Sequence, residues 1–288
     1  SSHKVLVTGY DFFSDSATLI RERWTSVFGA PGAVDGTLIG ADWGLGSNDA
    51  RRDALLARLC GNGGSRFGVS SVSGHATHFL EGVPSGSFQD IQGLSTESLL
   101  APLACGGSGL DLSGGVMYAL GCHGGLTVPG ADPLDENHSL DLPQTFLSRG
   151  VVAYVANSGY GWASRFGPGY AKRLTQLLTE QMTSGNEVVI GDAVRRSKLR
   201  YFDQSSSLPD PYDEKTLMQW TLYGLPMYAV KTGIGVTAAG SAADSRKALD
   251  RPALEHFGGV AVERKPAVNV TRARAAAGPA APANVALP

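Results

Sequence analysis

The stretch "GGVMYALGCHGG", Gly114–Gly125, is an apolar run that ends abruptly at a cysteine and a histidine between glycines. A short apolar run bounded by glycines is typical of a strand buried on both faces of a parallel sheet. We therefore predict a strand over 115–121, with Cys122 and His123 at its carboxyl end. In open parallel sheets, ligands and catalytic groups collect at this end of the strands.

Strands and helices alternate on both sides of this stretch. Apolar runs predict further strands over 4–8, 36–43, 67–73, 151–162 and 227–230. Between them, apolar residues at helical spacing predict helices over 18–28, 47–59, 170–182 and 192–201, with a short one over 96–101. This βαβα order predicts the α/β class, with a mostly parallel sheet and helices on both faces.

The composition is that of a globular protein with an unusual tail. The chain has 288 residues, of which 42% are hydrophobic and 17% charged, with a net charge of −2. Scattered basic residues argue against nucleic acid as a partner, and no apolar run reaches the roughly 18 residues of a membrane span. From 238 onward the chain becomes Ala/Pro-rich, so we expect a domain over 1–237 and a low-complexity tail or linker over 238–288.

The chain has three cysteines, Cys60, Cys105 and Cys122. Their odd number and irregular spacing predict neither a disulfide framework nor a zinc site, and no motif calls for a cofactor. Cys60 lies on the apolar face of a predicted helix and Cys105 lies in a glycine-rich loop, so we interpret both as structural. Cys122 is the candidate nucleophile.

A histidine also follows the strand predicted before Cys122. The sequence "GHATH", from Gly74 to His78, comes directly after 67–73. If the two strands are neighbours, His75 or His78 lies close to Cys122. An imidazole would then take the thiol proton and return it to a leaving amine.

Glycines and a third histidine surround the candidate nucleophile. Gly121 and Gly124 let a substrate carbonyl approach and leave amide groups for a developing oxyanion. His123 is an alternative base, but adjacent residues on a strand point to opposite sides, which favours a role in shaping the pocket.

At these residues the sequence resembles the gingipain-type cysteine peptidases, which have the caspase-like (caspase-hemoglobinase) fold. That family has a Gly-His pair after one strand and a small-Cys-x-x-Gly pattern after the next. Gly74-His75 and Gly121-Cys122 match, 47 residues apart. The segments "RGVVAYVANSGYGWA" (149–163) and "EKTLMQWTLYGLPMYAVKT" (214–232) are similar to the family's segments after the nucleophile and at the end of the domain. One departure is Ala76, where the family commonly has glycine after the histidine.

The resemblance implies a three-layer fold and a cysteine endopeptidase. It implies a His–Cys dyad that cleaves protein or peptide substrates through a thioester, without metal or cofactor. It also implies flanking domains in a longer chain and a secreted or cell-surface location. Asp42 and Asp90 are candidates for the carboxylate with which the family recognises basic residues. The residues expected to form the walls of the substrate site are Gly74, Asn157, Ser158, Tyr160 and Trp162.

Two alternatives stay open from the sequence. The motif "GCHGG" also resembles the nucleophile elbow of the deglycase/intracellular-protease family, but that elbow runs directly into a helix. Here Pro129, Pro133 and Pro143 oppose an immediate long helix. The third interpretation is a catalytically silent caspase-like binding module, because a fold alone does not determine activity.

Overall fold

The computed structural model describes residues 4–61, 66–85, 91–127, 140–164, 167, 169–205 and 210–232. All of them belong to one compact unit, Ser1–Ala239. Its main sheet has six strands in the order β2-β1-β3-β6-β7-β9. The first five run parallel, and β9 pairs antiparallel with β7 at one edge. The strands are β1 (Val5–Gly9), β2 (Val34–Asp35), β3 (Val69–Ser73), β6 (Val116–Leu120), β7 (Ala153–Asn157) and β9 (Trp220–Gly224).

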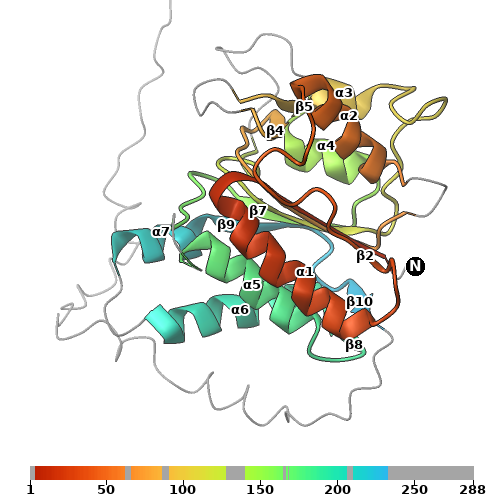
Figure 1. Cartoon of the computed structure of the whole chain (residues 1–288). Coiled ribbons are helices and arrows are strands. Elements are labelled where there is room, and N and C mark those ends of the chain that lie inside the picture. Colours follow the sequence, from red (N-terminus) through yellow and green to blue (C-terminus); the bar gives the residue numbers. More distant parts are fainter. Residues whose placement is uncertain are drawn as a thin grey trace, which may run out of the picture. The chain divides into compact units, whose positions relative to one another are not determined.

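Helices cover both faces of this sheet, which gives the three layers seen in Figure 1. On one face lie α1 (Ser14–Phe28), α5 (Ala171–Met182) and α6 (Ile190–Ser205). On the other lie α2 (Asn48–Leu59), α3 (Thr96–Leu100) and α4 (Leu142–Ser148), while α7 (Pro211–Gln219) leads into β9. The α/β class, the mostly parallel sheet and the helices on both faces are therefore confirmed.

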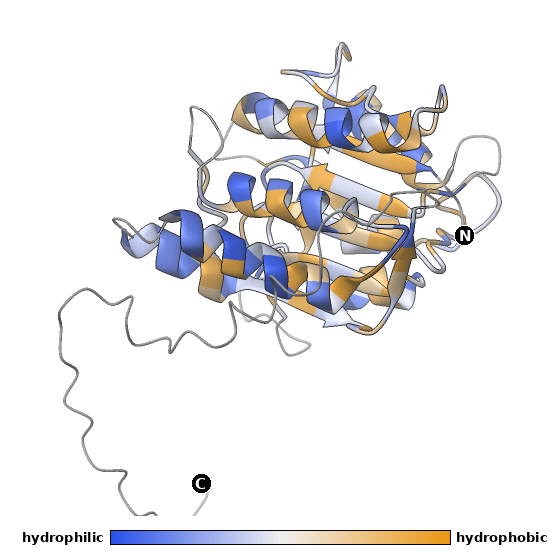
Figure 2. Cartoon of the chain, turned by 90° about the horizontal axis from the view of Figure 1, so that it is seen from below, coloured by the Kyte–Doolittle hydropathy of each residue, from blue (hydrophilic) through white to orange (hydrophobic). Residues whose placement is uncertain are grey.

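Alternate residues of each central strand enter two separate cores. In β6, Val116 and Tyr118 pack with α1 and α5, whereas Met117 and Ala119 pack with α2 and α4. Side chains of a strand alternate between the faces, so a strand buried on both sides must be apolar throughout. The helices need only one apolar side, and they expose hydrophilic residues on the other (Figure 2). No described helix is long and apolar enough to cross a membrane.

Two predicted strands differ from the structure. The segment predicted as a strand over 36–43 forms turns, with a single bridge from Ile39 to Gly9. The Asp35 side chain accepts the amide of Thr37, and Gly40 has φ +138°, so the backbone leaves the extended conformation there. The parallel edge strand is instead the two-residue β2.

The strand that closes the sheet is also not the one predicted over 227–230. That place belongs to β9, because Gly224 has φ +96° and turns the chain away from the sheet. The following strand β10 (Ala229–Lys231) pairs with β8 (Glu187–Val189) in a separate antiparallel sheet. A second small sheet, formed by β4 (Leu80–Gly82) and β5 (Gly93–Ser95), lies after β3 in the chain.

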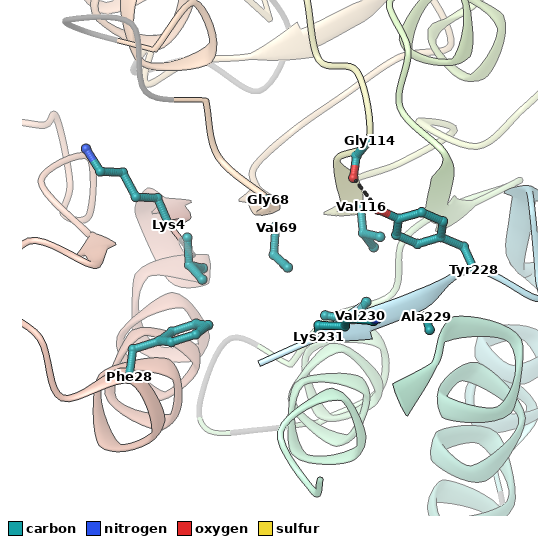
Figure 3. A pocket seen from close by; sticks show the side chains of 11 residues that line it. Lys4, Phe28, Gly68, Val69, Gly114, Val116, Tyr228, Ala229, Val230 and Lys231 are labelled. Carbon is teal, nitrogen blue, oxygen red and sulfur yellow. Dashed lines mark hydrogen bonds between the residues drawn. The ribbon is translucent and has the colours of Figure 1, made fainter. Parts of the chain in front are cut away.

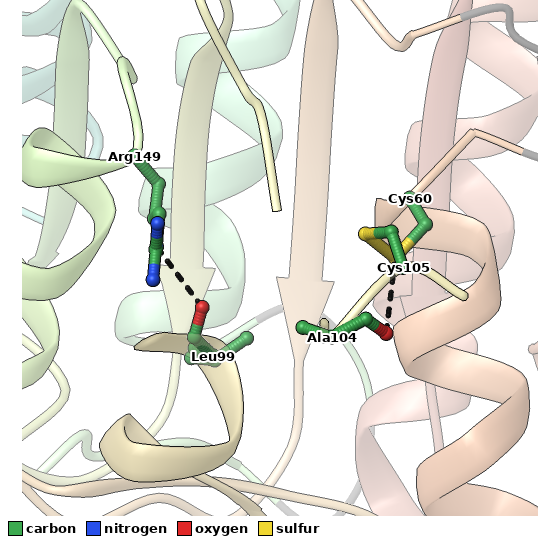
Figure 4. Close-up of a disulfide and its surroundings, with 5 residues drawn as sticks. All are labelled: Cys60, Leu99, Ala104, Cys105 and Arg149. Carbon is green, nitrogen blue, oxygen red and sulfur yellow. Dashed lines mark hydrogen bonds between the residues drawn. A yellow bond between two sulfur atoms is a disulfide. The ribbon is translucent and has the colours of Figure 1, made fainter. Parts of the chain in front are cut away.

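The prediction that the cysteines form no disulfide is wrong. Cys60, at the end of α2, is bonded to Cys105 across a sequence separation of 45 residues, as Figure 4 shows. The apolar helix face and the glycine-rich loop that suggested two structural thiols are the surfaces that this bond joins. Cys122 is the one free cysteine. The odd count therefore reflects one disulfide and one thiol.

Removal of this disulfide is expected to destabilise the fold without touching Cys122. A crosslink over this span restricts the unfolded chain, which corresponds to about 3–4 kcal/mol of stability. Urea unfolding of the Cys60→Ser/Cys105→Ser double variant should show a loss of this order, and non-reducing peptide mapping of the wild type should recover the 60–105 pair. Two free thiols in addition to Cys122 in the oxidised protein would contradict the assignment.

Candidate active site

Three adjacent parallel strands deliver three polar side chains to the same edge of the sheet. Gly9 of β1 pairs with Ser73 of β3, and Ser73 pairs with Leu120 of β6. Two residues beyond each of these positions come Asp11, His75 and Cys122. The ladder continues past β3, because the Gly74 amide donates to the Leu120 carbonyl at 2.9 Å. The three strands therefore end level with one another, and an acid, an imidazole and a thiol follow their ends at the same spacing.

His75 lies in a mostly aromatic environment with one carboxylate beside it. Its Nε2 is 3.6 Å from Oδ2 of Asp11, and its ring makes edge contacts with Tyr10, Phe12 and Phe13 at 5.3–5.7 Å. Burial lowers the pKa of His75 below its usual value, and the nearby carboxylate of Asp11 opposes this shift. The imidazole is therefore neutral near pH 7, which is the form that accepts a proton.

Cys122 is half-buried and carries a free thiol. Burial raises its pKa above the usual value, and the backbone amide of Gly161, which faces the sulfur, opposes the shift. With the pKa of the thiol raised and that of the imidazole lowered, both groups are neutral near pH 7. A neutral imidazole is the form that can take a proton from a thiol and so generate a thiolate.

The backbone after Cys122 is held in a fixed turn. His123 has a positive φ of 58°, and its amide donates to the Gly159 carbonyl at 2.7 Å. The Gly125 amide donates to the Asn157 carbonyl at 2.8 Å, and the Tyr154 hydroxyl donates to the Gly124 carbonyl at 2.9 Å. A side chain on Gly125 would approach the backbone of β7 too closely. The glycines are thus needed for the path of the chain.

Two amides beside the thiol are suited to hold an oxyanion. Among the described residues, the amides of Ala76 and Cys122 donate to no protein acceptor. They belong to adjacent loops, because a Cβ on Gly121 would lie 3.4 Å from the Ala76 nitrogen. Amides of neighbouring loops that converge near a nucleophile stabilise the charge that develops on a carbonyl oxygen. The alanine at position 76 can replace the family's glycine in this role, because the hydrogen-bond donor is the backbone amide and not a side chain.

The other two candidate histidines lie near each other. His78 packs against the Phe79 ring at 4.2 Å, and its backbone carbonyl accepts the amide of Leu142. Burial and the charge of His78 lower the pKa of His123, whose ring contacts Tyr160 at 4.6 Å. Of the three histidines, His75 is the one that comes two residues after the end of β3, and its Nε2 lies 3.6 Å from Asp11. The geometry favours His75 over both.

Of the residues expected to form the substrate wall, some are exposed and others hold the loops in place by hydrogen bonds. Tyr160 is 61% exposed and its ring lies 6.2 Å from that of Trp162. Asn157 is buried and donates to the Gly121 carbonyl at 3.1 Å. Ser158 donates its amide and its hydroxyl to the Gln219 carbonyl at the end of α7. Tyr160 and Trp162 are therefore available to a ligand, while Asn157 and Ser158 hold the loops.

The glycine before His75 also brings two backbones together. A side chain on Gly74 would collide with the ring of Tyr10. The Tyr10 hydroxyl in turn accepts the His75 amide at 2.9 Å. Tyr10 and Tyr154 thus fix the two loops that carry the imidazole and the thiol.

A buried carboxyl group, Glu81 of β4, is close to both tyrosines. It is 2% exposed and pairs with Ala76 in an isolated antiparallel bridge. Neither carboxyl oxygen has a hydrogen-bond partner among the described residues, and its charge acts on Tyr10 and Tyr154. Burial raises the pKa of Glu81 to about 8, so the group is largely protonated at neutral pH.

Asp11, Glu81 and Gly161 are site residues that were not predicted from the sequence. For Asp11 a signal was present, since it follows the first strand as His75 follows the third. Catalytic groups collect at the carboxyl ends of parallel strands, so Asp11 could have been predicted in the same way as His75. Glu81 and Gly161 depend on contacts between distant loops and carry no local motif.

No group of three or more metal-ligating side chains occurs among the described residues. A small pocket of about 30 Å³ opens at the amino ends of β1, β3 and β6, where Lys4, Val69 and Lys231 are among its lining residues (Figure 3). It lies at the opposite edge of the sheet from Cys122. Asp42 lies in an exposed loop, and Asp90 is outside the described residues.

The nucleophile-elbow interpretation lacks its defining feature. Residues 121–127 form turns, and the next described helix, α4, begins only at Leu142. A nucleophile elbow requires a helix directly after the nucleophile. We therefore set the deglycase-like interpretation aside.

Comparison with known proteins supports the fold but not a closer relationship. No protein-family model matches the sequence, and no curated protein matches it. The structure is similar to that of the Arg-specific cysteine proteinase gingipain R (RgpB), with a TM-score of 0.50 and 14% identity over 79% of this chain and 47% of that chain. The RgpB pro- and mature-domain complex from Porphyromonas gingivalis follows, with a TM-score of 0.48, 14% identity and coverage of 80% and 49%. For the Saccharomyces cerevisiae separase–securin complex the TM-score is 0.46 and the sequence identity 13%, over 80% of this chain and 12% of that chain.

The chain thus has the caspase-like fold, and its structural neighbours are cysteine peptidases. It spans about half the length of the gingipain chains that it matches. At this level of identity the likeness establishes the arrangement of strands and helices alone.

The buried acid gives a stability test for the inner part of the site. Between about pH 4.5 and 8 the unfolded chain releases the Glu81 proton while the folded chain keeps it, so wild-type stability falls as the pH rises. The Glu81→Gln variant lacks this fall, and its free energy of unfolding relative to wild type should increase between pH 5 and 8 by up to roughly 3.5 kcal/mol. Urea unfolding at both pH values measures this, with Glu187→Gln on exposed β8 as control. A constant difference between the two proteins would show that Glu81 ionises normally.

Proposed function

We propose that the chain is a cysteine endopeptidase, of the gingipain type, in which Cys122 is the nucleophile and His75 the general base. The observation that supports this most strongly is the parallel pairing of β3 with β6, whose paired ends Ser73 and Leu120 each come two residues before His75 and Cys122. The free thiol, the neutral imidazole and the unengaged amides beside them are what acyl transfer requires. The caspase-like fold of known cysteine peptidases agrees with this proposal.

The reaction begins when the Cys122 thiol transfers its proton to His75 and the sulfur attacks a peptide carbonyl. The carbonyl oxygen becomes an oxyanion, which the amides of Cys122 and Ala76 stabilise. The C–N bond then breaks, and the departing amine takes the proton from His75. Water, deprotonated by His75, hydrolyses the thioester and releases the second product with the thiol restored.

Asp11 positions the base. Its carboxylate lies 3.6 Å from the His75 ring and favours the protonated imidazole that forms during attack. The residue adopts a positive φ of 51°, which is unfavourable for a residue other than glycine. A strained backbone at the register position beside His75 fits a functional demand on this carboxylate.

The substrate is a protein or peptide whose side chains meet Tyr160 and Trp162 next to the nucleophile. Asn157 and Ser158 keep this wall in place through their bonds to Gly121 and Gln219. We place the peptidase domain over 1–237, with 238–288 as a linker to a flanking domain. A secreted or cell-surface location agrees with the Cys60–Cys105 disulfide, because such bonds persist in oxidising compartments.

The decisive experiment combines cleavage with labelling. Wild-type protein should cleave members of a fluorogenic peptide panel and be alkylated by iodoacetamide at Cys122. Cys122→Ala should abolish both, and His75→Ala should lower kcat/KM by ~10²–10⁴-fold. His78→Ala, with the same loss of an imidazole in the same loop, should keep most of the activity. Cleavage by Cys122→Ala would refute the proposal, whereas silence of the folded wild type across the panel would favour a binding module.

The pH profile of peptidase activity should reflect a resting state in which Cys122 and His75 are both neutral. Because the pKa of His75 is lowered and that of Cys122 is raised, activity should rise through a pKa below 6.5 and fall only above pH 9. Iodoacetamide reacts with thiolate, so its rate in the absence of substrate should still increase between pH 7 and 9. A labelling rate that is already constant from pH 6 would indicate a preformed thiolate–imidazolium pair instead.

The Asp11→Asn variant tests the positioning role. It should lower kcat about ten- to a hundredfold with little change in KM, and shift the acid limb of the pH profile to lower pH, because the imidazolium loses its carboxylate. Asp42→Asn, an exposed aspartate in a nearby loop, is the control and should leave the limb in place. An unchanged limb in Asp11→Asn would restrict Asp11 to a structural role. A specific loss with basic substrates in Asp42→Asn would make Asp42 the specificity carboxylate.

A further inference from the structure

The aromatic surface beside the candidate nucleophile continues onto α7. We define the aromatic row as Tyr160, Trp162 and Tyr212. The His123 ring lies 4.6 Å from its first member, Tyr160, and the ring centres are 6.2 Å apart from Tyr160 to Trp162 and 4.4 Å apart from Trp162 to Tyr212. Tyr160 and Tyr212 are 61% and 41% exposed. An extended peptide advances ~3.3 Å per residue, so the row is as long as a few substrate residues.

A positive charge lies at the far end of this row. The ammonium of Lys215 is 5.8 Å from the Trp162 ring centre and 5.6 Å from that of Tyr212. No described carboxylate forms an ion pair with it. Both rings hold the ammonium by cation–π attraction and leave its charge unneutralised.

The acidic residues nearest in sequence are engaged elsewhere. Asp210 accepts the Tyr170 hydroxyl at 2.7 Å and caps α7 through the amides of its first turn. Asp213 accepts the hydroxyl of Tyr201 and closes the capping box with Asp210. Glu214 precedes Lys215 directly, and adjacent residues on a helix do not face each other. Lys215 is therefore the charged side chain of this helix that lies against the rings of the row.

The row is a built surface that is held at a fixed position relative to Cys122. The last turn of α7 receives both hydrogen bonds of Ser158, and a side chain on Gly159 would press into Gln219. The loop that carries Tyr160 and Trp162 also places the Gly161 amide at the Cys122 sulfur. A ligand bound on the aromatic row is thus held at a fixed position relative to the Cys122 thiol.

We propose that the aromatic row with Lys215 is a substrate subsite for a peptide segment in which an aromatic or apolar side chain is followed by Asp or Glu. The ring faces take the apolar side chain, and Lys215 takes the carboxylate. A substrate lysine or arginine at the same place meets an ammonium that already occupies the rings and is repelled. This inference rests on the proposed peptidase function, and it assigns a selectivity to that same site.

Binding to an inactive variant tests the subsite without cleavage. Fluorescein-labelled peptides that differ only in an Asp, Asn or Lys after a Phe are titrated into Cys122→Ala protein, and anisotropy gives Kd. We expect the Asp peptide to bind about three- to tenfold more tightly than the Lys peptide, an effect that salt weakens. In the Cys122→Ala background, Lys215→Ala should remove this preference and Lys215→Glu should reverse it. Lys231→Ala, at the opposite edge of the sheet, is the matched control and should leave it unchanged.

The outcomes separate the subsite from the peptidase function. Equal binding of the three peptides, tighter binding of the Lys peptide, an unchanged preference in Lys215→Glu, or no binding by any of them would overturn the subsite. Cleavage by the wild type without an acidic preference would overturn the subsite and leave the peptidase intact. An Asp preference that depends on Lys215, in a protein without Cys122-dependent cleavage, would overturn the peptidase and leave a peptide-binding surface.

Discussion

The candidate site depends on the parallel register of three central strands. Hydrogen bonds between β1, β3 and β6 keep Gly9, Ser73 and Leu120 level, so the residues two positions further along leave the sheet together. A shift of one residue in any strand would turn its side chains to the other face. The two cores make such a shift costly, because each strand would bury the wrong residues. The packing that stabilises the sheet therefore also sets the positions of the acid, the imidazole and the thiol.

Much of this arrangement could be predicted from sequence because it follows from strand order. An apolar run closed by Gly121 and Cys122, after one closed by Gly74 and His75, sufficed to bring the two side chains to one edge. Turns within apolar segments were harder to predict from the sequence. The apolar residues over 36–43 look like a strand, but a side-chain turn at Asp35 and the left-handed Gly40 divide the segment. The disulfide was missed because pairing of distant cysteines is set by tertiary contacts that spacing does not encode.

The buried residues that support the site could not be predicted from sequence patterns. Tyr10 and Tyr154 appear in the sequence as ordinary strand aromatics, yet their hydroxyls bond to the loops of His75 and Cys122. Glu81 has the signature of a surface residue but is buried beside them without a partner in the described chain. A protonated acid is less costly there than a charge, since burial penalises the ionised form. Burial has the same effect on the site's thiol and imidazole, since it raises the pKa of Cys122 and lowers that of His75.

Trapping of Cys122 by a second thiol tests this register most directly. Neighbouring residues on paired strands have Cα atoms close enough for a disulfide, which needs about 4.4–6.8 Å. We predict that, after mild oxidation of His75→Cys protein, peptide mapping finds a 75–122 disulfide, whereas His78→Cys, three residues further along the same loop, leaves Cys122 free. A 78–122 disulfide in the second variant, with Cys122 unpaired in the first, would contradict the alignment of His75 with Cys122.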